Sequence, residues 1–438
     1  MIAPLQALRE GRFVTRERAR LWSVAFLVGY ALALVGLAAT AHGASDYHGR
    51  PLGTDFSSFY SAGRLALAGH AAAPFDSTRL HHMQQTLFGA HTPFYAFAYP
   101  PVFLLMVTPL AALPYMPALL LWQGATLLFY LFALALLLRR VGGIDLAKDR
   151  TALLLVLAFP AVFVNLIHGQ NAFLTAALFS LALAFLNDRP ILAGVFFGLL
   201  IYKPQFGLMI PLALAASGRW RTIAAAAATV LVLMLLATAL FGRDIWHAFF
   251  LSMTFANHVI LDLGAVGYEK MQSAFAAVRL LGGGVGPAYA VQGAVSLATA
   301  AALIKLWHSR ESPQRKAAGL CLASLLATPF CLDYDFVLMA PAIALMAAEA
   351  RTCGPLSYEK SLLAALWLAP AVARAVAGTI AVPLGMPVLA LGLFATLRSA
   401  LRAWQTQANS SPNSRGTEAE PAPARPSAPL TGEAVADF

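Results

Sequence analysis

The sequence predicts an all-α polytopic membrane protein. Hydrophobic residues make up 59% of its 438 residues, charged residues only 11%, and the mean hydropathy is +0.70. The chain therefore carries more apolar surface than a soluble core could bury. Long apolar runs recur from Leu21 to near Arg402. These runs are continuous and lack the two-residue alternation of membrane barrel strands, which excludes a β-barrel.

The N-terminal segment, residues 1–20, predicts the orientation in the membrane. Five arginines precede the first apolar run, which covers residues 21–41 and is too long for the core of a cleaved signal peptide. They are Arg9, Arg12, Arg16, Arg18 and Arg20. Because basic residues flank spans on the cytoplasmic side, we expect a cytoplasmic N-terminus. The basic residues behind the net charge of +10 flank the apolar runs, so we interpret them as determinants of membrane topology. We expect no nucleic-acid partner.

Extending this charge bias along the chain gives about 12 transmembrane helices with both termini in the cytoplasm. The expected spans are residues 21–41, 115–138, 152–167, 171–187, 190–202, 204–217, 222–241, 286–308, 316–331, 334–350, 361–380 and 383–403. Several are shorter than the roughly 20 residues that a bilayer crossing needs. The clearest case is the pair that flanks Lys203, where a broken helix with polar residues is expected to line a cavity.

One proline-rich stretch is not expected to cross the membrane. Residues 99–114 contain four prolines, and a crossing there would place Arg139 and Arg140 outside. A helix in the outer interface fits better. Residues 42–114 are then one large first extracytoplasmic loop with interfacial helices, within a membrane domain that covers residues 21–403.

The C-terminal residues and the cysteines are not expected to carry function. Residues 404–438 are rich in Pro, Ser, Ala, Gly and Glu, so we expect a disordered cytoplasmic tail. Cys321 falls within a span, Cys331 at the outer end of that span and Cys353 on the cytoplasmic side. No disulfide and no cysteine-rich metal site is expected.

Unusual polar residues concentrate on the expected extracytoplasmic side, at five separate breaks between apolar runs. They are Asp55; His168, Gln170 and Asn171; Lys203 and Gln205; Gln272 within residues 268–273; and Asp333, Tyr334 and Asp335. Loops that only reverse the chain have no reason to collect such side chains, so we expect a polar cavity that opens outward. The chain shows no internal repeat of the kind typical of secondary transporters, which favours an enzyme.

Six motifs occur in an order that resembles a known family. They are DFSSFYSAGRLALAG, YPPVFLLMVTPLAALPY, NLIHGQNAFLTAALF, YKPQFGLMIPLALAASGRWR, MQSAFAAVRLLGG and TPFCLDYDFVLMAPA. Over roughly residues 20–400 the chain is similar to glycosyltransferase family 87, membrane enzymes of the GT-C architecture. The resemblance implies an inverting transfer of a hexose, typically mannose, from a polyprenyl-phosphate donor to a lipid or glycan acceptor. The reaction is expected on the extracytoplasmic face of the bacterial cytoplasmic (inner) membrane.

The resemblance also implies residue roles. Asp55, the aspartate of the first extracytoplasmic loop, corresponds to the general base of the family. The chain departs from the best-known members at Leu332-Asp333-Tyr334-Asp335, which replaces a histidine-containing stretch. The acceptor of those members is therefore not carried over.

The chemistry of this transfer explains the residue types. An acceptor hydroxyl needs a base as it attacks the anomeric carbon. The phosphate leaving group needs positive charge and hydrogen-bond donors, unlike the substrate of a glycosidase with its paired acids. We expect Asp55 to be catalytic, and the donor phosphate to be bound by Lys203, Arg64 and His168. The other expected substrate-binding residues are Gln170, Asn171, Gln205, Gln272, Asp333, Tyr334 and Asp335.

No metal and no cofactor is expected; the expected partners are the sugar donor, the acceptor and membrane lipids. Each assignment has a structural alternative. Asp55 could only cap the helix that follows it, Lys203 could extend to the outer interface, and His168 could be an ordinary interface residue. Arg64 could pair with an acid, and the acids of the last motif could only terminate a helix pair. The alternative function is a transporter or flippase of a polyprenyl-linked glycan or lipid.

Overall fold

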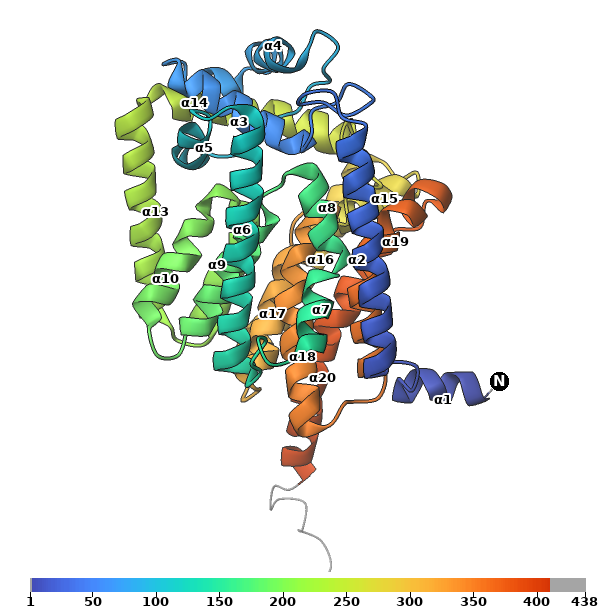
Figure 1. Ribbon diagram of the computed structural model, residues 1–438. Coiled ribbons are helices and arrows are strands. Elements are labelled where there is room, and N and C mark those ends of the chain that lie inside the picture. Colours follow the sequence, from blue (N-terminus) through green and yellow to red (C-terminus); the bar gives the residue numbers. More distant parts are fainter. Residues whose placement is uncertain (1, 410–438) are drawn as a thin grey trace, which may run out of the picture. The chain divides into compact units, whose positions relative to one another are not determined.

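The computed structural model describes residues 2–409, whose regular structure is entirely helical (Figure 1). Residues up to Ala400 form one compact unit. The helices are α1 (Ile2–Glu10), α2 (Arg16–Ala39), α3 (Thr54–Leu67), α4 (Ser77–Phe88), α5 (Leu104–Leu110), α6 (Tyr115–Leu137), α7 (Arg150–Leu157), α8 (Pro160–His168), α9 (Ala172–Phe185), α10 (Pro190–Gly198), α11 (Pro204–Gly207), α12 (Met209–Ala216), α13 (Trp220–Phe241), α14 (Asp244–Asn257), α15 (Ala274–Leu280), α16 (Val285–His308), α17 (Pro313–Leu326), α18 (Met339–Cys353), α19 (Glu359–Ile380) and α20 (Gly385–Asn409).

Short helical turns connect several of these helices. They are η1 (Ala73–Phe75), η2 (Pro101–Phe103), η3 (Leu138–Gly142), η4 (Leu199–Tyr202), η5 (His258–Asp262) and η6 (Asp333–Leu338). The expected tail, residues 404–438, lies outside the described residues from position 410 onward.

Six helices in the described part of the chain are long and apolar enough to cross a membrane. They are α2, α6 with η3, α13, α16, η6 with α18, and α19. The pair α7 and α8, bent by 42° at its break, would make a seventh. Most of the other expected spans contain shorter helices, such as α9 with 14 residues. The polytopic membrane class is therefore confirmed, whereas twelve crossings remain a prediction.

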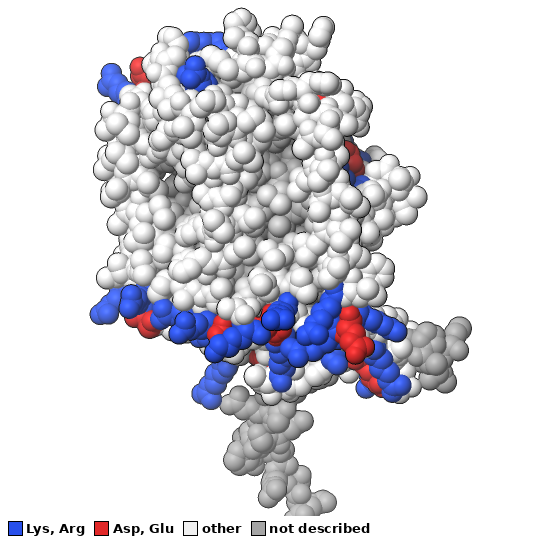
Figure 2. Space-filling model, in the orientation of Figure 1, with Lys and Arg blue, Asp and Glu red and all other residues white. Residues whose placement is uncertain are grey.

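Lysine and arginine side chains gather at one end of the helices. Figure 2 shows them as a band along the lower edge, while the rest of that face carries few charges. We call this the basic end; it holds the starts of α2, α7 and α13 and the end of α18, with Arg16, Arg150, Arg221 and Arg351. At the opposite end, α3, α4 and α14 lie across the tops of longer helices such as α6 (Figure 1).

Side-chain caps explain why several helices begin where they do. Thr15 caps α2 by accepting a hydrogen bond from the Arg18 amide, and Ser312 caps α17 through the Arg315 amide. Prolines begin α8 and α10, because the first helical position needs no amide hydrogen. α2 and α17 therefore begin a few residues before the expected spans 21–41 and 316–331, whereas α10 begins at the expected residue, Pro190.

A buried arginine joins three helices at the basic end. Arg315, on α17, contacts Glu349 of α18 at 2.5 Å and Glu359 at the start of α19 at 3.2 Å. All three side chains are at most 11% exposed. Because an unpaired charge in such a place is costly, this cluster ties the ends of the three helices together.

The proline-rich stretch forms η2 and α5, which are too short to cross a bilayer of about 30 Å. α5 packs against α3, where a Cβ on Gly63 would lie 2.6 Å from the Val107 carbonyl oxygen. Leu104 and Val107 are buried. α5 thus supports α3 from one side.

α10 and α13 approach closely through small residues. A Cβ on Gly194 would lie 2.5 Å from the Thr222 carbonyl oxygen and 2.6 Å from the Ala225 Cβ. A Cβ on Gly198 would lie 2.6 Å from the Thr229 Cβ. Small residues at such positions let membrane helices pack backbone to backbone.

This packing gives a test of the fold. We expect Gly194→Ala to destabilise the protein by about 1–3 kcal/mol, the usual cost of overpacking, and to lower the thermal unfolding midpoint in detergent. Gly124→Ala is the matched control, because Gly124 lies on α6 and a Cβ added there would have no neighbouring atom within 4 Å; its midpoint should stay unchanged or rise. Equal midpoints for the two variants would contradict the α10–α13 packing.

Candidate active site

Asp55 lies in the first turn of α3, at the end opposite the basic end (Figure 1). The N-cap of α3 is Gly53, with φ of +65°, and no side chain caps this helix. The capping alternative for Asp55 is therefore wrong. The Asp55 carboxylate instead accepts a hydrogen bond at Oδ2 from the Gln170 side-chain amide, at 2.9 Å. No described residue donates a hydrogen bond to its other oxygen, Oδ1.

Two glycines bring Asp55 to this partner. Gly53 and Gly169 both have positive φ, and a Cβ on Gly169 would lie 3.2 Å from the Gly53 Cα and 2.6 Å from the Phe56 Cβ. Gly169 ends α8, and its carbonyl accepts a hydrogen bond from the Trp122 indole. Only glycine fits both conformation and contact at these two positions.

The Gln170 side chain is oriented by its neighbours. Its Oε1 accepts hydrogen bonds from the Tyr99 hydroxyl at 3.2 Å and from the Asn171 amide at 3.0 Å. Because both bonds need the oxygen there, the NH₂ group must face Asp55. The buried Asn165 side chain fixes the turn between α8 and α9. It donates to the Gln170 carbonyl and accepts from the Ala172 amide.

His168 and Asn171, on either side of the Gly169-Gln170 turn, differ in exposure and in hydrogen bonding. The His168 Nδ1 lies 2.9 Å from the hydroxyl of Thr54, the residue before Asp55, and the ring is partly exposed. The Asn171 side chain is fully buried and makes no hydrogen bond within the described residues, although the Tyr99 hydroxyl is near. In this conformation Asn171 is closed to a substrate.

Lys203 and Asp335 form a buried ion pair. The Lys203 ammonium lies 2.7 Å from Asp335 Oδ1, and both side chains are at most 4% exposed. Asp335 Oδ2 accepts a hydrogen bond from the Leu332 amide. The ammonium also lies 5.3 Å from the centroid of the Tyr334 ring. The Lys203 side chain therefore does not extend to the outer interface. At the break between η4 and α11 it points into the protein.

The last motif is held by two neighbouring segments. The Asp333 amide donates to the Lys270 carbonyl, and the Gln272 amide donates to the Cys331 carbonyl, as in a short antiparallel pair. The Asp333 Oδ2 lies 3.4 Å from an Arg374 nitrogen of α19. This pairing brings Gln272 and Asp333 together.

Tyr334 connects the two groups of polar residues. Its ring centroid lies 6.2 Å from that of His168 and 5.3 Å from the Lys203 ammonium. Asp55 and Asp335 are close enough to interact electrostatically. The residues from four separate motifs thus form one polar site at the end opposite the basic end.

The family model of glycosyltransferase family 87 matches residues 97–329, more than half of the chain. The chain belongs to glycosyltransferase family 87. No curated protein and no solved structure matches it. The resemblance in the motifs is confirmed, over a narrower range than residues 20–400.

The matched range of this family 87 glycosyltransferase contains part of the site. Tyr99, Gln170 and Lys203 lie within it, whereas Asp55 and Asp335 lie outside. Each of these two acids is hydrogen-bonded to a residue inside the range. Both carboxylates, although outside the matched range, thus contact residues within it.

Two residues expected at the site lie apart from it. Arg64 is nine residues after Asp55, about 13 Å along α3, and its exposed side chain reaches the Ala111 carbonyl at 3.4 Å. Gln205 is partly exposed, and its side chain makes no hydrogen bond to the site residues in the described part of the chain. The structure does not bring either residue to the carboxylates of the glycosyltransferase.

Sequence reasoning missed two residues that the site contains. Tyr99 orients Gln170, and its only signal is its place at the start of the YPP motif. Arg374 pairs with Asp333, and it is a charged residue within an apolar span. Such an intramembrane charge is a functional candidate by itself, so Arg374 could have been found from the sequence.

The site contains acids but no cluster suited to a metal ion. In residues 2–409, no three His, Cys, Asp or Glu side chains come together. Cys321, Cys331 and Cys353 are free thiols. Activity of the glycosyltransferase without a metal remains a prediction.

The buried ion pair gives a test of the site. We expect Lys203→Met or Asp335→Leu alone to destabilise the protein by about 3–5 kcal/mol, because each leaves an unpaired buried charge. The double variant should be less destabilised than either single variant, as judged by thermal unfolding in detergent.

Lys148→Met is the control for that experiment. Its pair with Asp145 is exposed and 3.7 Å long, so its loss should cost at most about 1 kcal/mol. A double variant whose loss equals the sum of the two single losses would show that the two charges do not depend on each other.

Proposed function

We propose that this glycosyltransferase transfers a hexose, by resemblance mannose, from a polyprenyl-phosphate donor to a hydroxyl of a lipid or glycan acceptor, with inversion. The observation that carries the proposal is the Asp55 carboxylate. One of its oxygens is held by Gln170 and the other has no described donor. A carboxylate that is oriented but not saturated can accept a proton from a bound hydroxyl.

The proposed step is a single displacement. The acceptor hydroxyl approaches Asp55 Oδ1 and attacks the anomeric carbon, while its proton passes to the carboxylate. The bond between that carbon and the phosphate oxygen breaks, and the electron pair leaves with polyprenyl phosphate. Because the leaving group is already a stable anion, no general acid is needed. Inversion follows from attack opposite the leaving group.

Two cations and a histidine of this polar site support binding of the donor phosphate. The Lys203 ammonium has three N–H donors and uses one on Asp335, so it can share the others with a phosphate oxygen. His168 is hydrogen-bonded to the Thr54 hydroxyl, next to Asp55, and its ring is partly exposed. Arg374, half-exposed and paired with Asp333, replaces Arg64 as the third candidate. Donors fixed in a partly buried site stabilise developing charge strongly.

The remaining polar residues suit substrate hydroxyls. Asp333 is buried beside Arg374, and Gln272 lies on the segment that pairs with the last motif. Tyr334 offers a ring next to both His168 and Lys203. We assign these three residues to the sugar or the acceptor, and Gln170 to the orientation of Asp55.

The charge distribution supports a location of this site outside the cytoplasm. The basic end (Figure 2) lies opposite α3, which carries Asp55 (Figure 1). Basic residues flank membrane spans on the cytoplasmic side. We therefore assign the basic end to the cytoplasmic face of a bacterial inner membrane, and Asp55 to its extracytoplasmic face.

The role of Asp55 makes a direct prediction. Asp55→Asn should lower turnover at least about 100-fold, the scale of a lost general base, with an unchanged thermal midpoint. The assay measures the rate at which polyprenyl phosphate is released, in proportion to new glycolipid, from polyprenyl-phosphate mannose and a lipid extract. A transporter would release none.

Asp76→Asn is the matched control for this assay. Asp76 caps α4 through the amides of Thr78 and Arg79, and asparagine caps equally well. Its activity should equal that of the unaltered enzyme. Near-normal turnover of Asp55→Asn would remove Asp55 from the mechanism.

Topology gives a second prediction. His48 is exposed in the first loop, and the native Cys353 is exposed at the basic end. A membrane-impermeant maleimide should label His48→Cys in intact cells, whereas Cys353 should be labelled only after permeabilisation. Mass spectrometry of the two peptides separates the signals. Labelling in the reverse order would place the site in the cytoplasm.

A further inference from the structure

A cavity of about 520 Å³ opens at the basic end, far from the site just described. The start of α2, the loop before α7 and the end of α18 form its walls. Five basic and two acidic side chains line it, so its net charge is positive. The basic residues are Arg16, Arg20, Lys148, Arg150 and Arg351.

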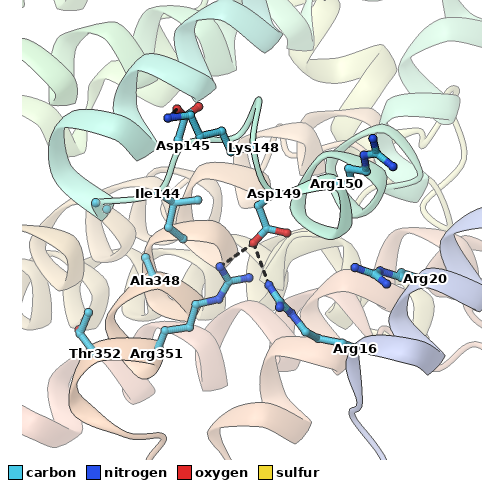
Figure 3. A pocket seen from close by; sticks show the side chains of 12 residues that line it. Arg16, Arg20, Ile144, Asp145, Lys148, Asp149, Arg150, Ala348, Arg351 and Thr352 are labelled. Atoms are coloured by element: carbon cyan, nitrogen blue, oxygen red, sulfur yellow. Dashed lines mark hydrogen bonds and ion pairs between the residues drawn. The ribbon is translucent and has the colours of Figure 1, made fainter.

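Asp149 holds the residues that line this cavity in place. Its Oδ1 caps α7 through the amides of Thr151 and Ala152. Its Oδ2 accepts from Arg351 at 2.8 Å and from Arg16 at 3.2 Å. Figure 3 shows the two arginines on either side of this carboxylate. A single partly buried acid thus holds guanidinium groups from two distant helices in fixed positions.

Asp149 remains charged in this role. Burial raises the pKa of its carboxyl, but the hydrogen bond from the Ala152 amide and the contact with Arg351 outweigh burial, and the pKa lies below its usual value. The arginines are therefore anchored at neutral pH.

The arginines keep most of their donors free. A guanidinium has five N–H groups, and Arg16 and Arg351 each use one on Asp149. Their side chains are 68% and 45% exposed, so an anion can reach them. Arg20 donates through Nε to the Thr151 hydroxyl at 2.6 Å, and its terminal nitrogens have no partner among the described residues. Planar guanidinium groups bind phosphate oxygens in pairs.

One wall of the cavity faces lipid. Only 6% of the apolar window of α2 is buried within the protein, so most of that helix is surrounded by acyl chains. Arg16 and Arg20 lie in its first turns, at the depth of the lipid headgroups. An occupant that reaches these arginines beside α2 is thus at the boundary between headgroups and acyl chains.

We propose that this cavity binds the phosphate of an anionic glycerophospholipid headgroup. Basic pockets between transmembrane helices on the cytoplasmic side favour such ligands. The volume lies within the usual range of ligand pockets, about 300–1,000 Å³. The bound lipid bridges α2 to α18, and it thereby stabilises a span that the rest of the protein holds weakly. This site is independent of the transferase reaction.

The test uses the full-length protein in nanodiscs of phosphatidylcholine with increasing fractions of phosphatidylglycerol. Native mass spectrometry measures the retained phosphatidylglycerol, and thermal unfolding measures the bridging. Phosphatidylglycerol should be retained and should raise the thermal midpoint. Arg20→Gln and Arg351→Gln should each weaken retention about fivefold, since a basic residue near the surface contributes about 1 kcal/mol.

Arg221→Gln and Arg310→Gln are the matched controls. Both arginines are exposed and lie outside the cavity, yet their loss changes the net charge equally. Retention by these variants should match that of the unaltered protein. Equal weakening in the control and cavity variants would reduce the effect to a general attraction of charges and overturn the proposal.

A final arm identifies the source of the phosphate. sn-Glycerol 3-phosphate or inorganic phosphate at millimolar concentration should neither displace the lipid nor raise the thermal midpoint in phosphatidylcholine. If either does so as effectively as phosphatidylglycerol, the cavity binds a soluble phosphate and the lipid assignment is wrong. If Arg351→Gln fails to fold, Arg20→Gln alone tests the proposal. This variant loses only the hydrogen bond to Thr151, so it is expected to fold.

Discussion

The close approach of two glycine backbones is the constraint on which the candidate active site depends. A Cβ on Gly169, at the end of α8, would lie 2.6 Å from the Phe56 Cβ of α3 and 3.2 Å from the Gly53 Cα. The hydrogen bond between Gln170 and Asp55 crosses the same contact. A larger residue at Gly169 would separate α3 from α8 and remove the carboxylate from its orienting amide. A backbone contact thus determines where the proposed base lies.

Charge pairing organises the remainder of the site. Lys203 and Asp335 are both buried, and neither would be tolerated there alone. Asp333 is likewise held by Arg374 and by the Tyr334 amide. A site for a charged sugar donor needs cations in a partly dry environment. The acidic partners of these cations keep them in place before the sugar donor binds. In the proposed function, the phosphate of the sugar donor then shares N–H groups that are already in position.

The same principle operates at both ends of the molecule with different outcomes. At the basic end, Asp149 holds Arg16 and Arg351 near water, so that the cavity there carries an excess of positive charge. At the opposite end, the charges are nearly balanced and surrounded by aromatic rings such as that of Tyr334. One end suits attraction of lipid phosphate, and the other suits a reaction that needs both a base and cations.

The sequence by itself determined the membrane class and the positions of the long apolar helices, because hydrophobicity and charge bias act along the chain. The order of its polar motifs indicated the family. It predicted that Asp55, His168, Lys203 and Asp335 lie at one end. Only the tertiary structure decided which side chains meet. Arg64 shares a helix with Asp55 but lies too far along it, whereas Arg374 of α19 reaches Asp333 and Lys203 reaches Asp335, 132 residues later. Such partners depend on packing between distant helices, which no local pattern encodes.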